Sequence, residues 1–127
     1  MSKLFFAVAF IFTNFSTHAQ YLSHSIFDTV HQADTLVDRV TSTRFILDSS
    51  RILIVAIDTN GRQLWKSDPW KDNKLKAYRV ARPTIVIFHF AKNASTSFEE
   101  VIWIGYNNTQ FGIVDKNTGE FTWLGQD

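Results

Sequence analysis

Two histidines and an aspartate near the start of the chain have the spacing of a metal site. His24, Asp28 and His31 are separated by four and three residues, so on a helix they would share one side. Two imidazoles and a carboxylate are donors that zinc accepts. An apolar row that begins at Ile26 would lie on the opposite side of the same helix, so a solvated helix surface explains all three residues. We therefore predict no bound metal and no cofactor, and keep these residues only as candidate ligands.

The other titratable residues do not form a catalytic set. His89 alternates with Ile85 and Ile87 in a strand-like segment, and the sequence supplies no partner that would make it a general base. Glu99 and Glu100 are adjacent, so in a strand their carboxylates point to opposite faces. The chain has no cysteine, which excludes a thiol nucleophile and a thiolate metal site. We predict that the protein is not an enzyme.

An aromatic and basic stretch, "LWKSDPWKDNK" at residues 64–74, is the main candidate for a binding surface. Tryptophan is enriched where proteins dock and where one side of the ring stays wet. The alternative is that Trp70 folds back over the end of a sheet, because tryptophan is highly buried on average. The predicted residues for binding a protein partner or a glycan are Trp65, Trp70 and Lys71.

The first nineteen residues have the order of a secretory signal peptide. Lys3 precedes an apolar run that ends at Phe12, and small residues at Thr17 and Ala19 suit cleavage after Ala19. The apolar run is much shorter than the ~20 residues that a bilayer-spanning helix needs, although a retained anchor is the alternative. We expect a cleaved signal peptide (residues 1–19), a single β-rich domain (residues 20–127) and a secreted or periplasmic location without membrane insertion after cleavage.

The mature chain would be electrically neutral. Loss of Lys3 leaves twelve basic residues against twelve acidic ones, so there is no cationic field to hold nucleic acid. Without cysteine, no disulfide can offset a small core. The sequence has twelve Phe, four Trp and three Tyr, of which all but five Phe lie after residue 19 and supply apolar area instead. We predict a well-packed domain that does not bind nucleic acid.

One helix and a series of strands follow from the spacing of the apolar residues. The stretch "SIFDTVHQADTLVDRV" (residues 25–40) repeats apolar residues at helical spacing. Strand character follows at residues 43–47, 52–57, 62–66, 76–80, 84–90, 99–106, 110–115 and 120–124. The predicted fold class is mainly β (α+β): an N-terminal amphipathic helix, then an antiparallel meander of 7–8 strands forming a sandwich or a partly closed barrel.

Two stretches resemble each other around a turn. "AIDTNGRQLW" covers residues 56–65, and "GIVDKNTGEFTWLG" covers residues 112–125. The second is similar to the D-x-x-T-G-x-x-x-W signature of the pyrroloquinoline-quinone-type propeller repeat, in which the glycine makes the turn and the tryptophan packs between blades. The first departs from it, because Asn60 replaces the threonine and the Asp–Gly spacing is one residue shorter. A closed propeller needs at least four blades and the mature chain holds about two, so we interpret both stretches as hairpin turns.

These observations favour a protein that works by binding. We predict a small exported, non-enzymatic protein-binding module, such as an inhibitor, an immunity-type protein or an envelope accessory protein. A carbohydrate-binding module that uses exposed tryptophans is the first alternative, and a structural subunit of a homo-oligomer is the second. Residues 52–57 and 84–90 are apolar on both faces and need cover on both, which makes a homodimer a further expectation.

Overall fold

The structure is a computed structural model that describes residues 33–93, 95 and 98–127. The predicted signal peptide at 1–19 and the candidate metal ligands His24, Asp28 and His31 lie outside these residues. The first part of the predicted helix, residues 25–32, also lies outside them. In the part that is described, no helix is long and apolar enough to cross a bilayer.

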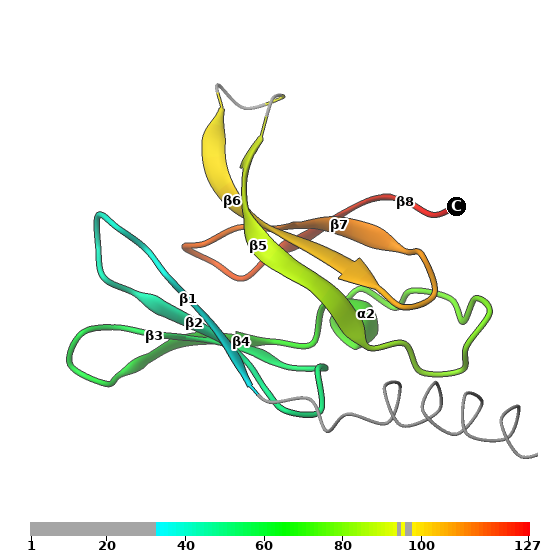
Figure 1. Cartoon of the computed structure of the whole chain (residues 1–127), viewed down its shortest axis with the longest axis horizontal. Coiled ribbons are helices and arrows are strands. Elements are labelled where there is room, and N and C mark those ends of the chain that lie inside the picture. Colours follow the sequence, from blue (N-terminus) through cyan, green and yellow to red (C-terminus); the bar gives the residue numbers. More distant parts are fainter. Residues whose placement is uncertain (1–32, 94, 96–97) are drawn as a thin grey trace, which may run out of the picture. The chain divides into compact units, whose positions relative to one another are not determined.

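The described chain forms two four-stranded antiparallel sheets and almost no helix (Figure 1). The first sheet consists of β1 (Asp34–Val37), β2 (Arg44–Leu47), β3 (Ile54–Ile57) and β4 (Gln63–Ser67). The second consists of β5 (Ile85–Asn93), β6 (Glu99–Tyr106), β7 (Phe111–Val114) and β8 (Phe121–Gly125). A single helical turn, α2 (Pro69–Asp72), lies between them in the chain. The prediction of a mainly β protein is confirmed.

The strands form two separate meanders of four, where the sequence predicted one meander of 7–8. The segment that connects β4 to β5 contains Pro69 and Pro83, both fully buried. Proline has no N–H to donate to a neighbouring strand, so this segment does not continue the ladder. The strand predicted at residues 76–80 is reduced to one bridge between Tyr78 and Val80.

The prediction of a helix up to residue 40 is wrong in its described part, because Asp34–Val37 forms β1. Each residue of β1 is paired with β2, and Leu36 lies opposite Phe45. Leu36 packs against the core while Val37 is 51% exposed, which is the two-residue alternation of a strand. Pairing with β2 and the β-branched residues of this segment outweigh its helical spacing.

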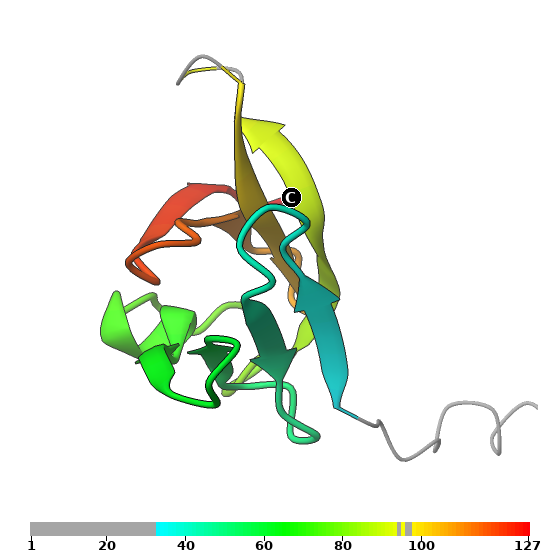
Figure 2. The same ribbon diagram turned by 90° about the vertical axis from the view of Figure 1, so that its left-hand side faces the viewer.

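One face of each sheet, here called the inner face, contributes to a shared hydrophobic core. Phe45 of β2 meets Phe90 of β5 edge to face, with ring centroids 6.0 Å apart. The N–H of Ile85 donates to the carbonyl oxygen of Arg51 at 2.8 Å, and Arg51 Nε donates to the carbonyl oxygen of Ile85 at 2.6 Å. Figure 2 shows the strands of the first sheet, cyan to green, beside those of the second, yellow-green to red. The buried core residues are Phe45, Leu47, Ile54, Ala56 and Trp65 from the first sheet and Ile85, Ile102, Ile104, Tyr106, Val114 and Phe121 from the second.

The two similar sequence stretches form corresponding turns, one in each sheet. The β3–β4 turn begins at Asp58 and the β7–β8 turn at Asp115, and each connects neighbouring antiparallel strands. Gly61 and Gly119 have positive φ angles of 80° and 76°, which glycine adopts without steric cost. In each turn the glycine N–H donates to the carbonyl oxygen of the aspartate, at 3.0 and 2.9 Å.

The β2–β3 and β6–β7 turns also correspond. Arg51 and Thr109 both have positive φ. Each donates its backbone N–H to the carbonyl oxygen three residues earlier, on Asp48 and Tyr106 respectively. The second sheet therefore repeats the strand order and these turns of the first.

Candidate functional site

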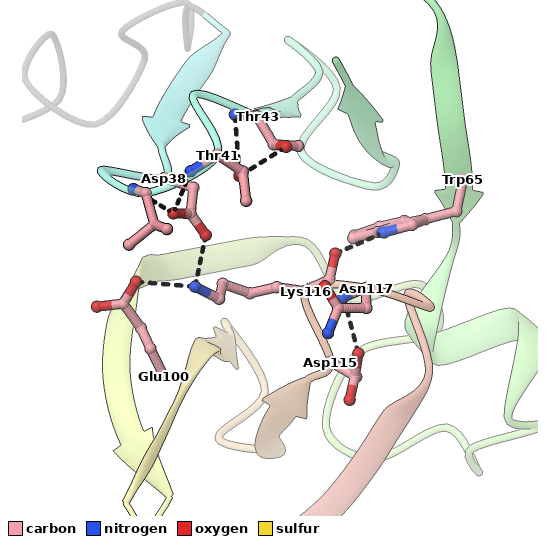
Figure 3. Close-up of polar contacts among 9 residues, drawn as sticks. Asp38, Thr41, Thr43, Trp65, Glu100, Asp115, Lys116 and Asn117 are labelled. Carbon is pink, nitrogen blue, oxygen red and sulfur yellow. Dashed lines mark hydrogen bonds and ion pairs between the residues drawn. The ribbon is translucent and has the colours of Figure 1, made fainter. Parts of the chain in front are cut away.

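A partly buried ion-pair cluster joins the two sheets (Figure 3). Lys116 Nζ donates to Asp38 Oδ2 at 2.6 Å and to Glu100 Oε1 at 3.0 Å. Asp38 follows β1 and Glu100 belongs to β6, so the ammonium group links the sheets. The side chain of Asp38 is only 7% exposed, and its Oδ1 accepts hydrogen bonds from the N–H groups of Val40 and Thr41. Both oxygens of the buried carboxylate thus have partners.

This pairing favours the charged form of both groups. The hydrogen bond from Lys116 lowers the pKa of Asp38, and the N–H groups of the turn act in the same direction, against the effect of burial. Burial acts to lower the pKa of Lys116, but hydrogen bonds to Asp38 and Glu100 outweigh it and raise that pKa. Lys116 is therefore a structural cation and is poorly suited to act as a base or nucleophile.

Replacing Lys116 by alanine is expected to lower the free energy of unfolding by about 2–3 kcal/mol at pH 7, because a buried carboxylate loses its cation. The folded pKa of Asp38 lies below its ordinary value of 3.8, so its stabilising contribution is present above that value and is lost as the pH falls through the lowered pKa. Urea denaturation of both proteins should show their difference shrinking below about pH 4. Lys76→Ala, which removes an exposed ammonium group, is the control, and an equal loss there would contradict the prediction.

Trp65 of β4 is buried between the sheets, with 9% of its surface exposed. Its Nε1 donates to the carbonyl oxygen of Lys116 at 2.8 Å (Figure 3). Its ring lies against the backbone of Gly119 and 5.9 Å from the ring of Phe45, measured between centroids. One side chain of the first sheet thereby docks on the β7–β8 turn of the second.

Trp70 of α2 is half-buried and is held by the chain from two sides. Its Nε1 donates to Gln110 Oε1 at 3.1 Å, and the guanidinium carbon of Arg82 lies 4.9 Å from its ring centroid. Lys71 is exposed to solvent. Of the three predicted binding residues, Trp65 is thus buried, Trp70 is half-buried and Lys71 is exposed.

Trp123 lies four residues after its turn glycine, as Trp65 does. When the two sheets are aligned by their corresponding turns, however, the two tryptophans lie on opposite sides of the aligned sheets. Trp65 is paired with Ala56 after a bulge at Leu64, whereas the bulge in β8 follows the tryptophan, which pairs with Gly112. Trp123 is 48% exposed. The packing role that the propeller resemblance implies for the tryptophan is therefore filled by Trp65 and not by Trp123. Trp123 instead lines a pocket of about 440 Å³ with Lys74, Leu75, Lys76, Ala77, Tyr78, Gln110 and Gln126.

The side of the second sheet that faces away from the first is apolar and aromatic, and we call it the second outer face. Trp103 of β6 and Phe111 of β7 stack, with ring centroids 5.5 Å apart and an interplanar angle of 23°. Ile87 of β5 is 43% exposed, and with these rings and Asp127 it lines a pocket of about 360 Å³. A second pocket on this face, of about 210 Å³, is lined by Asn93, Glu99, Val101, Ile113, Asp115, Glu120 and Thr122. Both rings are half-buried, and partly exposed rings and aliphatic groups bordered by charges are typical of protein-docking surfaces.

The described residues do not bring together a catalytic or metal-binding set. His89 is exposed, and the hydrogen-bond contact of its Nδ1 is to the backbone oxygen of Phe90, at 2.9 Å. Glu100 binds Lys116, while Glu99 lies on the second outer face, so the predicted divergence of these carboxylates is confirmed. In this part of the chain, no group of three or more His, Asp or Glu side chains could hold a metal ion.

The sequence pattern did not single out Lys116 or Phe111, and it indicated Trp103 only as a stacking platform for a glycan. Asp38 is 78 residues from Lys116 and Glu100 is 16 residues from it, so no local spacing indicates the cluster. Trp103 and Phe111 lie in strands that are apolar on both faces, and such strands do not reveal which face is open. The usable signal was the need of such strands for cover on both sides.

The chain matches no protein-family model, no curated protein and no solved structure. A function for it must therefore be inferred from the geometry of its own residues.

Proposed function

We propose that the chain is a small exported, non-enzymatic protein-binding module that docks a partner on the second outer face. An inhibitor, an immunity-type protein or an envelope accessory protein would use such a surface. The observation that carries the proposal is the stacked pair Trp103–Phe111 beside the exposed Ile87, an apolar surface that no other described segment covers. Aromatic and aliphatic anchors of this kind dominate the energetics of protein interfaces.

Ile87→Glu tests this surface, and the neighbouring Val86→Glu is its matched control. Ile87 is paired with Gly105 on the second outer face, whereas Val86 lies at the register shift of β5 and is 50% exposed. Tagged wild-type protein, Gln20 onward, is expected to capture one specific partner from cells of its source. Ile87→Glu should lose at least about tenfold in affinity, since a desolvated charge at an interface centre costs more than 1.4 kcal/mol, and Val86→Glu should retain binding. Equal binding by both variants would contradict the proposal.

Carbohydrate binding is the second candidate, and the pocket at Trp123 favours it. The exposed ring of Trp123 lies near Tyr78 and the amides of Gln110 and Gln126, and aromatic rings with a wet edge suit ligands that are partly polar. On a glycan array, this function predicts retention of the wild type, its loss in Trp123→Ala and no effect of Ile87→Glu. A wild type that binds no glycan would remove this candidate.

A further inference from the structure

The corresponding turns of the two sheets align their strands residue by residue. Because Asp58 corresponds to Asp115, Ala56 corresponds to Ile113. Phe45 is paired with Ala56, and Trp103 is paired with Ile113, so Phe45 corresponds to Trp103. Phe45 and Ala56 lie on the inner face of the first sheet, but Trp103 and Ile113 lie on the second outer face. The inner face of the first sheet, which is buried against the second sheet, thus corresponds to the second outer face. Among the described residues, nothing covers the second outer face.

The inner face of the second sheet likewise corresponds to the side of the first sheet that faces away from the core. Val114 and Phe90 of the second sheet pack toward the core. Their counterparts in the first sheet are Ile57 and Val37, which share the side facing away from the core. We call this side the first outer face, and its apolar residues are Val37, Ile46, Val55 and Ile57. Among its described residues, each chain therefore carries an uncovered counterpart of both surfaces that meet in its own core.

We propose that the first outer face of a second copy of this chain covers the second outer face. This inference rests on the proposed function, because it names the partner of the same surface. The contact would repeat the packing of the two sheets within one chain. Trp103 of one copy would meet Val37 of the next, as Phe45 meets Phe90 inside the chain at 6.0 Å.

The charges at the borders of the two outer faces are complementary. Arg44 and Lys66 share the first outer face with Val37 and Val55, and both are exposed. Glu99 and Glu120 border the second outer face. Opposite charges on two surfaces steer them together and disfavour pairing of either surface with itself. The assembly is therefore head to tail, with different surfaces in contact.

Head-to-tail contacts produce a closed ring when the rotation between copies closes, and an open filament when it does not. Radially repeated four-stranded sheets close with about four to eight sheets. With two such sheets in each chain, a ring would contain about two to four copies.

Single cysteines test which surfaces meet, because the chain has none of its own. Within one chain β1 and β5 lie side by side, so the repeat places β5 of one copy beside β1 of the next. His89→Cys on the second outer face and Val37→Cys on the first are mixed, with a size tag on one of them, and then oxidised. The mixed disulfide is expected at about tenfold the yield of either homodimer, since the two thiols are held at high effective concentration. Dominance of either homodimer would overturn the head-to-tail arrangement.

The mass in solution provides the second measurement. Light scattering of the wild type should give a multiple of the chain mass that falls at high salt. Val37→Glu should give a monomer, because it places an unpaired carboxylate against the ring of Trp103 in the apolar part of the contact. Val80→Glu, in the connecting segment and 38% exposed in the wild type, should leave the mass unchanged.

A monomeric wild type at high micromolar concentration would overturn the inference. If Ile87→Glu still lost a different protein partner in that case, the proposed function would stand without self-association. If the wild type were an oligomer but showed no cross-linking between residues 37 and 89, the surfaces would be assigned wrongly. Each failure is thus separate from failure of the proposed function.

Discussion

Replacing Gly119 by alanine is expected to lower the free energy of unfolding by about 3 kcal/mol. The glycine has a φ of 76°, and a Cβ added to it would lie 2.5 Å from Cε3 of Trp65. A left-handed conformation costs about 1–2 kcal/mol for a residue with a Cβ, and overpacking adds about 1–3 kcal/mol. Trp65 is held between the sheets, so it has little room to move. Urea denaturation followed by circular dichroism measures the loss.

Gly61→Ala is the matched control for this change. Gly61 occupies the corresponding turn of the first sheet with a φ of 80°, but a Cβ there would meet no atom within 4 Å. We expect the backbone cost alone, about 1–2 kcal/mol. The difference between the variants isolates the contact with Trp65, and equal losses would show that this contact does not constrain the turn.

Trp65→Ala should destabilise the protein by about 3–5 kcal/mol, the usual cost of deleting a buried tryptophan. The ring fills the space between Phe45 and the backbone of Gly119. Its removal would leave a cavity, and the carbonyl oxygen of Lys116 would lose the hydrogen bond it accepts at 2.8 Å. The midpoint of chemical denaturation should fall sharply with little change in slope.

Two variants separate burial from the hydrogen bond. Trp65→Phe keeps most of the apolar contact and removes the N–H group, so a loss of about 1–2 kcal/mol is expected. Trp123→Ala, at a position 48% exposed in the wild type, should cost less than about 1 kcal/mol. If Trp123→Ala were as costly as Trp65→Ala, the difference in packing between the two tryptophans would be refuted.

Local signals were sufficient for the strands and for the tight turns. Asn60-Gly61 and Thr118-Gly119 indicated turns because glycine tolerates positive φ, and both turns are present. The doubly apolar strands 52–57 and 84–90 indicated a need for two covered faces. The structure covers one face of each with the opposite sheet, and we propose that another copy of the chain covers the open face of each sheet.

The segment from Asp34 to Val37 shows where local signals fail. Its apolar residues are compatible with helical spacing, and only pairing with β2 makes it a strand. Pairing partners come from elsewhere in the chain, so a short segment with mixed propensity is decided by its tertiary context. The predicted continuous meander failed for a related reason, because the connection through Pro69 and Pro83 separates the sheets.

Composition and the spacing of apolar residues are enough to show that this protein is mainly β and cysteine-free, and that its aromatic side chains must supply the core. Tertiary structure alone decided which aromatics are enclosed and which remain open. Trp65 and Trp123 have the same spacing from a turn glycine, and each pairs with a residue on the inner side of its own sheet, Ala56 and Gly112 respectively. Trp65 is nevertheless enclosed by the β7–β8 turn, whereas Trp123 is 48% exposed and lines an open pocket with the connection between β4 and β5. Local sequence sets the spacing of a tryptophan from its turn, but the residues that enclose it come from distant parts of the chain.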